Sequence, residues 1–105
     1  MFEGIEVKFG ENTYIIPPLS LGQLRGAARE LLKKHDELVL ANDLFGSMEL
    51  RGKLIHLALT RNYPDLDQEI VFNYLDMGNL DRLWAAVLGA SGLKPGEATA
   101  AETTK

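Results

Sequence analysis

The chain opens with an alternation of apolar and polar positions. Ile5, Val7 and Phe9 share one parity and have charged residues between them, as expected of a strand with one buried face. Turn residues follow at 10–12, and a stretch rich in β-branched and aromatic types comes after them. The pattern predicts a β-hairpin over residues 5–16. Because an isolated hairpin is only marginally stable in water, we expect it to pack against the rest of the chain.

A strong helix-start signal follows the two prolines that end the hairpin. Ser20 and Gln23 have the spacing of a capping box, and Leu19 and Leu24 have the spacing of a hydrophobic staple. Apolar residues then recur at helical intervals, and cations gather where the segment ends, as suits the negative end of the helix dipole. We predict a helix over residues 20–35.

The connector over residues 36–46 gives a mixed signal, because apolar residues stand beside the breakers Asn42 and Gly46. Two interpretations remain open, a short helical turn of its own or the rim of the first helix. A second helix is predicted over residues 47–62, with Ser47 at its start. Its apolar face is wider than one neighbour needs, which indicates packing against two elements.

Two shorter helices complete the predicted fold, and they span residues 67–77 and 79–88. Asp67 and Asn79 stand where each helix needs a cap. Gly78 and Gly89 stand where each could end in the left-handed conformation. Apolar residues of the last helix match the i, i+3, i+4, i+7, i+8 pattern at every position.

Together these elements predict an α+β fold that is predominantly helical. We expect one globular domain over residues 1–93, in which the N-terminal β-hairpin packs on a bundle of three to four short helices. Residues 94–105 are rich in Ala, Thr and Glu and have no apolar stripe, so we expect a flexible tail there.

Composition narrows the function classes. Hydrophobic residues make up 46% and charged residues 25% of the 105 residues, which is typical of a globular protein. Lys and Arg total 11 against 15 Asp and Glu, a net charge of −4. We expect no nucleic-acid partner, because that affinity comes mostly from neutralising phosphates. The basic residues that do cluster on the first helix indicate a solvated face or, as the alternative, a site for an acidic protein; they are Arg25, Arg29, Lys33 and Lys34.

Several kinds of chemistry find no support in the residues. There is no cysteine, which excludes a disulfide framework and a thiolate nucleophile. Apolar runs are short and the start of the chain has no apolar core segment, so we expect neither a membrane span nor a signal peptide. His35 and His56 lack partners at metal-ligand spacing, and we interpret both as solvated surface residues. We therefore expect no enzyme, no cofactor and no metal.

Three aromatic residues are candidates for contact with a partner. Trp84 lies within the apolar stripe of the last helix, which favours a place in the core. Phe72 lies off the main face of its helix, and Phe45 lies in the connector beside Gly46. For these two, burial and exposure as a partner anchor are equally compatible with the pattern.

Four segments in one order resemble the small tail assembly chaperones of long-tailed bacteriophages and prophages. The segments are IIPPLSLGQL at 15–24, LALTRNYPDL at 57–66, LDMGNL at 75–80 and AAVLGASGL at 85–93. The likeness covers residues 5–93, and its most specific piece is Arg61-Asn62-Tyr63-Pro64-Asp65.

The resemblance implies a non-enzymatic role in virion assembly within the host bacterial cytoplasm. Proteins of this family bind apolar helical segments of the long tape measure protein and keep it soluble while tail tube protein polymerises around it. Homo-oligomers are a further expectation. The alternative is a structural or adaptor protein that the phage tail retains. A helix-in-groove site for such a partner would involve the apolar residues Phe45, Phe72, Leu80 and Trp84.

Overall fold

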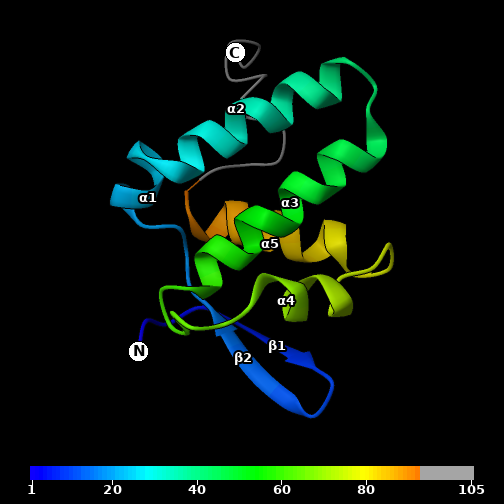
Figure 1. The fold of residues 1–105 in the computed structure, drawn as a ribbon. Coiled ribbons are helices and arrows are strands. Elements are labelled where there is room, and N and C mark those ends of the chain that lie inside the picture. Colours follow the sequence, from blue (N-terminus) through cyan, green and yellow to red (C-terminus); the bar gives the residue numbers. More distant parts are fainter. Residues whose placement is uncertain (93–105) are drawn as a thin grey trace.

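The computed structural model describes residues 1–92, which form two strands and five helices (Figure 1). Their bounds are β1 Ile5–Phe9, β2 Asn12–Ile16, α1 Leu21–Arg25, α2 Ala27–Leu40, α3 Leu44–Leu59, α4 Gln68–Tyr74 and α5 Leu80–Ala90. The predicted α+β class is confirmed, with an N-terminal antiparallel hairpin and a mainly helical remainder. The flexible tail predicted for residues 94–105 lies outside the described residues.

The hairpin forms where the alternating pattern placed it. Its register pairs Ile5 with Ile16 and Phe9 with Asn12, and Gly10 turns the chain with a φ of 65°, which glycine adopts without strain. The ring of Phe9 stacks on Tyr74 at the end of α4, with centroids 5.6 Å apart and an interplanar angle of 7°. The hairpin therefore packs against the helical part, as expected.

The first predicted helix is correct at its start and wrong at its end. Ser20 and Gln23 form the capping box, with Oγ of Ser20 accepting from the Gln23 N–H at 3.0 Å. The chain then breaks at Gly26, whose ψ of −114° lies far from helical values. A second helix, α2, begins there and continues through the predicted end at residue 35 to Leu40. The cations predicted for a last turn consequently lie in the middle of α2.

The connector over residues 36–46 belongs mostly to helices. Its first residues complete α2 and its last ones open α3, and Asn42 reverses the chain between them with a φ of 60°. Asp43 caps α3 by accepting from the Gly46 N–H at 2.9 Å. The predicted cap Ser47 is instead buried inside α3, where its hydroxyl donates to the Leu44 carbonyl at 2.8 Å. The resulting α2–α3 pair is a helical hairpin (Figure 1).

The end of α4 also differs from the prediction. Asp67 caps α4 as expected, but the helix ends at Tyr74, before the predicted residue 77. Gly78 does not adopt the left-handed conformation. The turn is held by Asp76 instead, whose Oδ1 accepts from the N–H groups of Gly78 and Asn79 at 2.8 and 3.0 Å.

The last helix runs two residues further than predicted, to Ala90. Asn79 occupies the cap position, but its side chain makes no cap bond to the helix. The amide of Asn79 donates to the Tyr74 carbonyl at 2.9 Å and so joins α4 to α5. The left-handed glycine beyond the helix is Gly92, with a φ of 84°, and Gly89 lies inside the helix.

The core is built around α3, which contacts α2, α4, α5 and β2. This confirms that its wide apolar face packs against more than one element, although the helix ends at Leu59 and not at residue 62. Residues with no exposed surface meet here from three helices, and they include Leu54, Ile55, Ala58, Leu59, Val71, Leu83 and Val87. Within residues 1–92, no helix has the length and apolar character needed to cross a bilayer.

Candidate functional site

A hollow of about 450 Å³ lies between the first half of α3, α4 and the segment that leads into α5. Its apolar lining comes from all three, and consists of Phe45, Met48, Phe72, Leu75 and Leu80. This volume is within the range of small ligand pockets. An apolar lining of this kind suits side chains inserted by a partner.

The hollow owes its shape to a glycine in the middle of α3. A Cβ atom on Gly52 would lie 2.9 Å from Cε1 of Phe72, closer than packed side chains allow. The missing side chain lets the Phe72 ring lie directly against α3. Glycine inside a helix costs about 0.5–1 kcal/mol relative to alanine. Its position in a long helix was the sequence signal for this close approach, and the sequence analysis missed it.

Large apolar side chains surround the hollow and face solvent. Phe45 is 77% exposed and Met77 is 74% exposed. A smaller hollow of about 70 Å³ shares Met48 and Leu80 with the first. A third, of about 220 Å³, shares Leu44 and Arg51 with this smaller one. We call the outer residues the α3 apolar surface, and they are Val39, Leu44, Phe45, Met48 and Met77.

The structure brings together three of the four predicted contact residues. Phe45, Phe72 and Leu80 line the same hollow. Phe45 is exposed, Phe72 is partly buried and Leu80 is 5% exposed, so Phe45 is the one best placed as an anchor. Trp84 does not line the hollow: it is 6% exposed and belongs to the core, as its stripe position favoured. It is therefore removed from the candidate contact residues.

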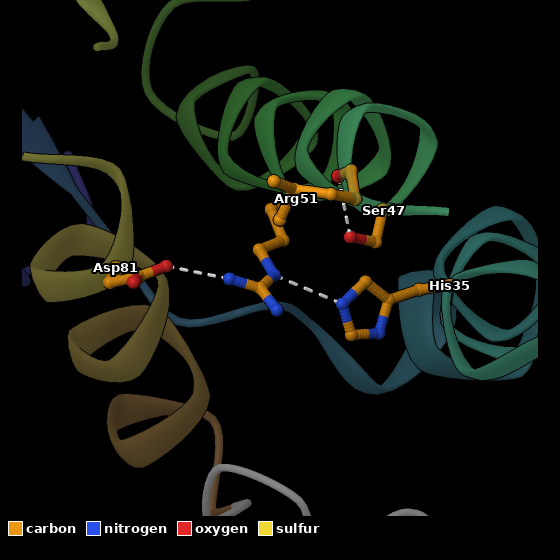
Figure 2. Close-up of polar contacts among 5 residues, drawn as sticks. His35, Ser47, Arg51 and Asp81 are labelled. Atoms are coloured by element: carbon orange, nitrogen blue, oxygen red, sulfur yellow. Dashed lines mark hydrogen bonds and ion pairs between the residues drawn. The ribbon is translucent and has the colours of Figure 1, made fainter. Parts of the chain in front are cut away.

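A polar chain crosses the helices beside this surface (Figure 2). The Nε–H of Arg51 on α3 donates to Nε2 of His35 on α2 at 3.0 Å, and Nη1 of Arg51 donates to Oδ1 of Asp81 on α5 at 2.6 Å. His35 also packs against Trp84, with ring centroids 5.1 Å apart. Arg51 on α3 is thus bonded to both α2 and α5.

His35 is 7% exposed, which corrects its interpretation as a surface residue. It is covered because α2 continues past residue 35 and packs along α3. Burial and the nearby Arg51 cation lower the pKa of His35, while Asp36 acts in the opposite direction. Arginine has no acceptor, so Nε2 of His35 must be the accepting nitrogen. The ring is therefore neutral in this arrangement.

His56 is partly buried and is not the solvated residue that was expected. Its Nε2 lies 2.7 Å from the Leu66 carbonyl, which can only accept, so Nε2 donates there. This bond holds the segment after α3. No group of three His, Cys, Asp or Glu in the described part of the chain could hold a metal ion.

The Arg61-Asn62-Tyr63 run, which carried much of the family likeness, ties the hairpin to the end of α3. Nη1 of Arg61 donates to the Pro18 carbonyl at 2.6 Å, and Nδ2 of Asn62 donates to the Ile15 carbonyl at 3.1 Å. The hydroxyl of Tyr63 accepts from the Ile15 N–H at 2.8 Å. The role of these three side chains in the fold is to hold β2 in place.

The chain was compared with protein-family models, with curated proteins and with solved structures. None of the three comparisons finds a match.

Proposed function

We propose that this protein is a non-enzymatic tail assembly chaperone of a long-tailed phage or prophage. In this role it binds apolar helical segments of the tape measure protein in the host bacterial cytoplasm and keeps them soluble while tail tube protein assembles. The observation that carries the proposal is the α3 apolar surface, where Phe45 faces solvent beside a hollow lined by Phe72 and Leu80.

An exposed apolar surface of this kind costs the fold stability. Burying apolar area is worth about 25 cal/mol per Å², and a small domain that leaves several large side chains in water forgoes that stabilisation. Contiguous exposed apolar patches on soluble proteins mark interaction sites. A helical partner could place its i, i+3, i+4 and i+7 side chains along a groove of this kind. A chain rich in amphipathic helices, such as a tape measure protein, presents many apolar helix faces with this spacing.

The test is co-expression of this chain with the tape measure protein of the same phage. The variant Phe45→Ser removes the exposed anchor while leaving the core untouched. Leu21→Ser is the matched control, because Leu21 is 79% exposed but lies on α1, outside the lining of all three hollows. We expect Phe45→Ser to reduce the soluble, co-purifying tape measure protein about tenfold or more, as loss of an interface anchor does. Leu21→Ser should retain wild-type capture.

Equal capture by both variants would refute the placement of the site on the α3 apolar surface. Failure of the wild-type chain to capture the tape measure protein would refute the function itself. Mass spectrometry of purified virions separates this role from a retained structural or adaptor protein. A chaperone should be absent from the particle, whereas a structural protein should be present at a fixed stoichiometry.

A further inference from the structure

The polar side chains that line the hollow are either acidic or neutral. Glu49, Glu69 and Asp76 line the hollow together with the neutral Gln68, and no Lys, Arg or His is part of the lining. The three carboxylates come from α3, from α4 and from the turn after α4. They therefore surround the apolar lining from several sides, instead of forming one edge.

These carboxylates are mostly free to meet a partner. Glu49 lies 3.5 Å from Lys53 in an ion pair in which Glu49 is exposed and Lys53 is partly exposed, and pairs near the surface are weak. Glu69 and Asp76 are exposed and take part in no ion pair within residues 1–92, although Oδ1 of Asp76 also accepts from the N–H groups of Gly78 and Asn79. Binding of a cationic partner here would not have to break a strong internal pair.

One group of cations lies away from the hollow. Arg25, Arg29 and Lys33 are exposed on α1 and on the first part of α2, and Figure 1 shows this end of α2 opposite the turn that leads into α3. Two other cations lie closer but are paired, Lys53 with Glu49 and Arg51 with Asp81. Glu69 and Asp76 are then acidic lining residues outside any ion pair within residues 1–92, which favours a cationic partner at the hollow.

We infer that the hollow selects amphipathic helices whose apolar stripe is flanked by Lys or Arg. This inference rests on the proposed function and names the chemistry of the segment that is bound. The apolar side chains of such a helix would enter between Phe45, Phe72 and Leu80, and its cations would reach Glu49, Glu69 and Asp76. A helix with the same stripe and acidic flanks would be repelled, so charge distinguishes otherwise similar segments.

Synthetic amphipathic peptides of about 18 residues, or about five helical turns, provide the probe. Three peptides share one leucine stripe and differ only in having Lys, Gln or Glu at the flanking positions. Affinities for the full-length protein are measured by fluorescence anisotropy at low and at high salt. At low salt we expect the Lys peptide to bind about tenfold more tightly than the Glu peptide, with the difference shrinking as salt screens the charges.

Variants locate the effect on the protein. In Glu49→Gln/Glu69→Gln, the preference for the Lys peptide should fall about threefold or more. Glu30→Gln is the matched control, because Glu30 is an exposed carboxylate in the first turn of α2, as Glu69 is in the first turn of α4. Glu30→Gln should preserve the preference. Phe45→Ser should lower the affinity for all three peptides to the same extent.

The outcomes separate this inference from the function on which it rests. Equal affinities for the Lys and Glu peptides would overturn the charge selection. If both affinities were lost in Phe45→Ser, the apolar binding site itself would still be supported. Absence of peptide binding would also overturn the inference, and tape measure capture would then decide the function on its own. If sedimentation showed that Phe45→Ser dissociates oligomers of the wild-type chain, the occupant would be a second copy and the inference would be wrong.

Discussion

Arg51 offers a comparison of two polar contacts made by one side chain. Its bond to Asp81 is short, at 2.6 Å, but the Asp81 side chain is 82% exposed. Its bond to Nε2 of His35 is longer, at 3.0 Å, but His35 is 7% exposed. Asp81→Asn removes the charge of the first contact alone, whereas Arg51→Met removes both contacts. The difference between the two variants therefore reports the contact with His35.

The environment of each contact sets the size of the loss. An exposed ion pair contributes about 0–1 kcal/mol, because water screens both charges. Leaving a buried acceptor without a donor costs about 1–3 kcal/mol. Methionine keeps most of the apolar stem of Arg51, so the lost packing is small. We expect Arg51→Met to lower the free energy of unfolding by about 1–3 kcal/mol and Asp81→Asn to lower it by less than about 1 kcal/mol.

Urea unfolding followed by circular dichroism measures these changes, at about pH 7.5, where a histidine with a lowered pKa is neutral. Arg82→Met serves as a control, because Arg82 is an exposed arginine on α5 and should change stability by less than about 0.5 kcal/mol. A loss in Asp81→Asn equal to that in Arg51→Met would refute the reasoning. It would mean that the short exposed pair, and not the buried acceptor, stabilises the helices.

Three further predictions follow from other contacts. Because burial lowers the pKa of His35 below 6.5, the unfolded state binds more protons below that pH; urea midpoints should fall on acidification from about pH 7 to pH 5, and His35→Gln should reduce this fall. Gly52→Ala should change the free energy of unfolding by less than about 1 kcal/mol, since the gain in helix propensity offsets the displaced Phe72 ring, yet it should weaken binding of the Lys peptide. Asn62→Ala removes the bond to the Ile15 carbonyl and should lower stability by about 1–2 kcal/mol, with faster amide hydrogen exchange in the hairpin than in α5; equal acceleration in both would contradict it.

Local signals predicted the parts of the fold that depend on neighbouring residues. The alternation before Gly10 and the spacing of Ser20 and Gln23 each describe a structure completed within a few residues. The helix ends were harder, because Asp43 and Ser47 are both acceptable caps and only the packing of α3 decides between them. The break at Gly26 could not be predicted from the residue alone, because glycine is tolerated within a helix as well as between helices.

The candidate site was predicted in part. Phe72 was singled out because it lies off the main face of its helix, and Phe45 because it lies in the connector; the structure places both at the hollow. Trp84 lies in the core, as its stripe position indicated. The burial of His35 could not be foreseen, because it requires Arg51 and Trp84, which the chain brings close only through the packing of three helices.

The placement of α3 has a consequence for how proteins with this fold can diverge. Its first half forms the floor of the hollow, while Leu54, Ile55 and Leu59 in its second half hold the interior together. A substitution along this helix that alters the hollow therefore risks the fold as well. Changes in what the hollow accepts should accumulate instead at Glu69 and Asp76, whose exposed side chains line the same space without belonging to the core.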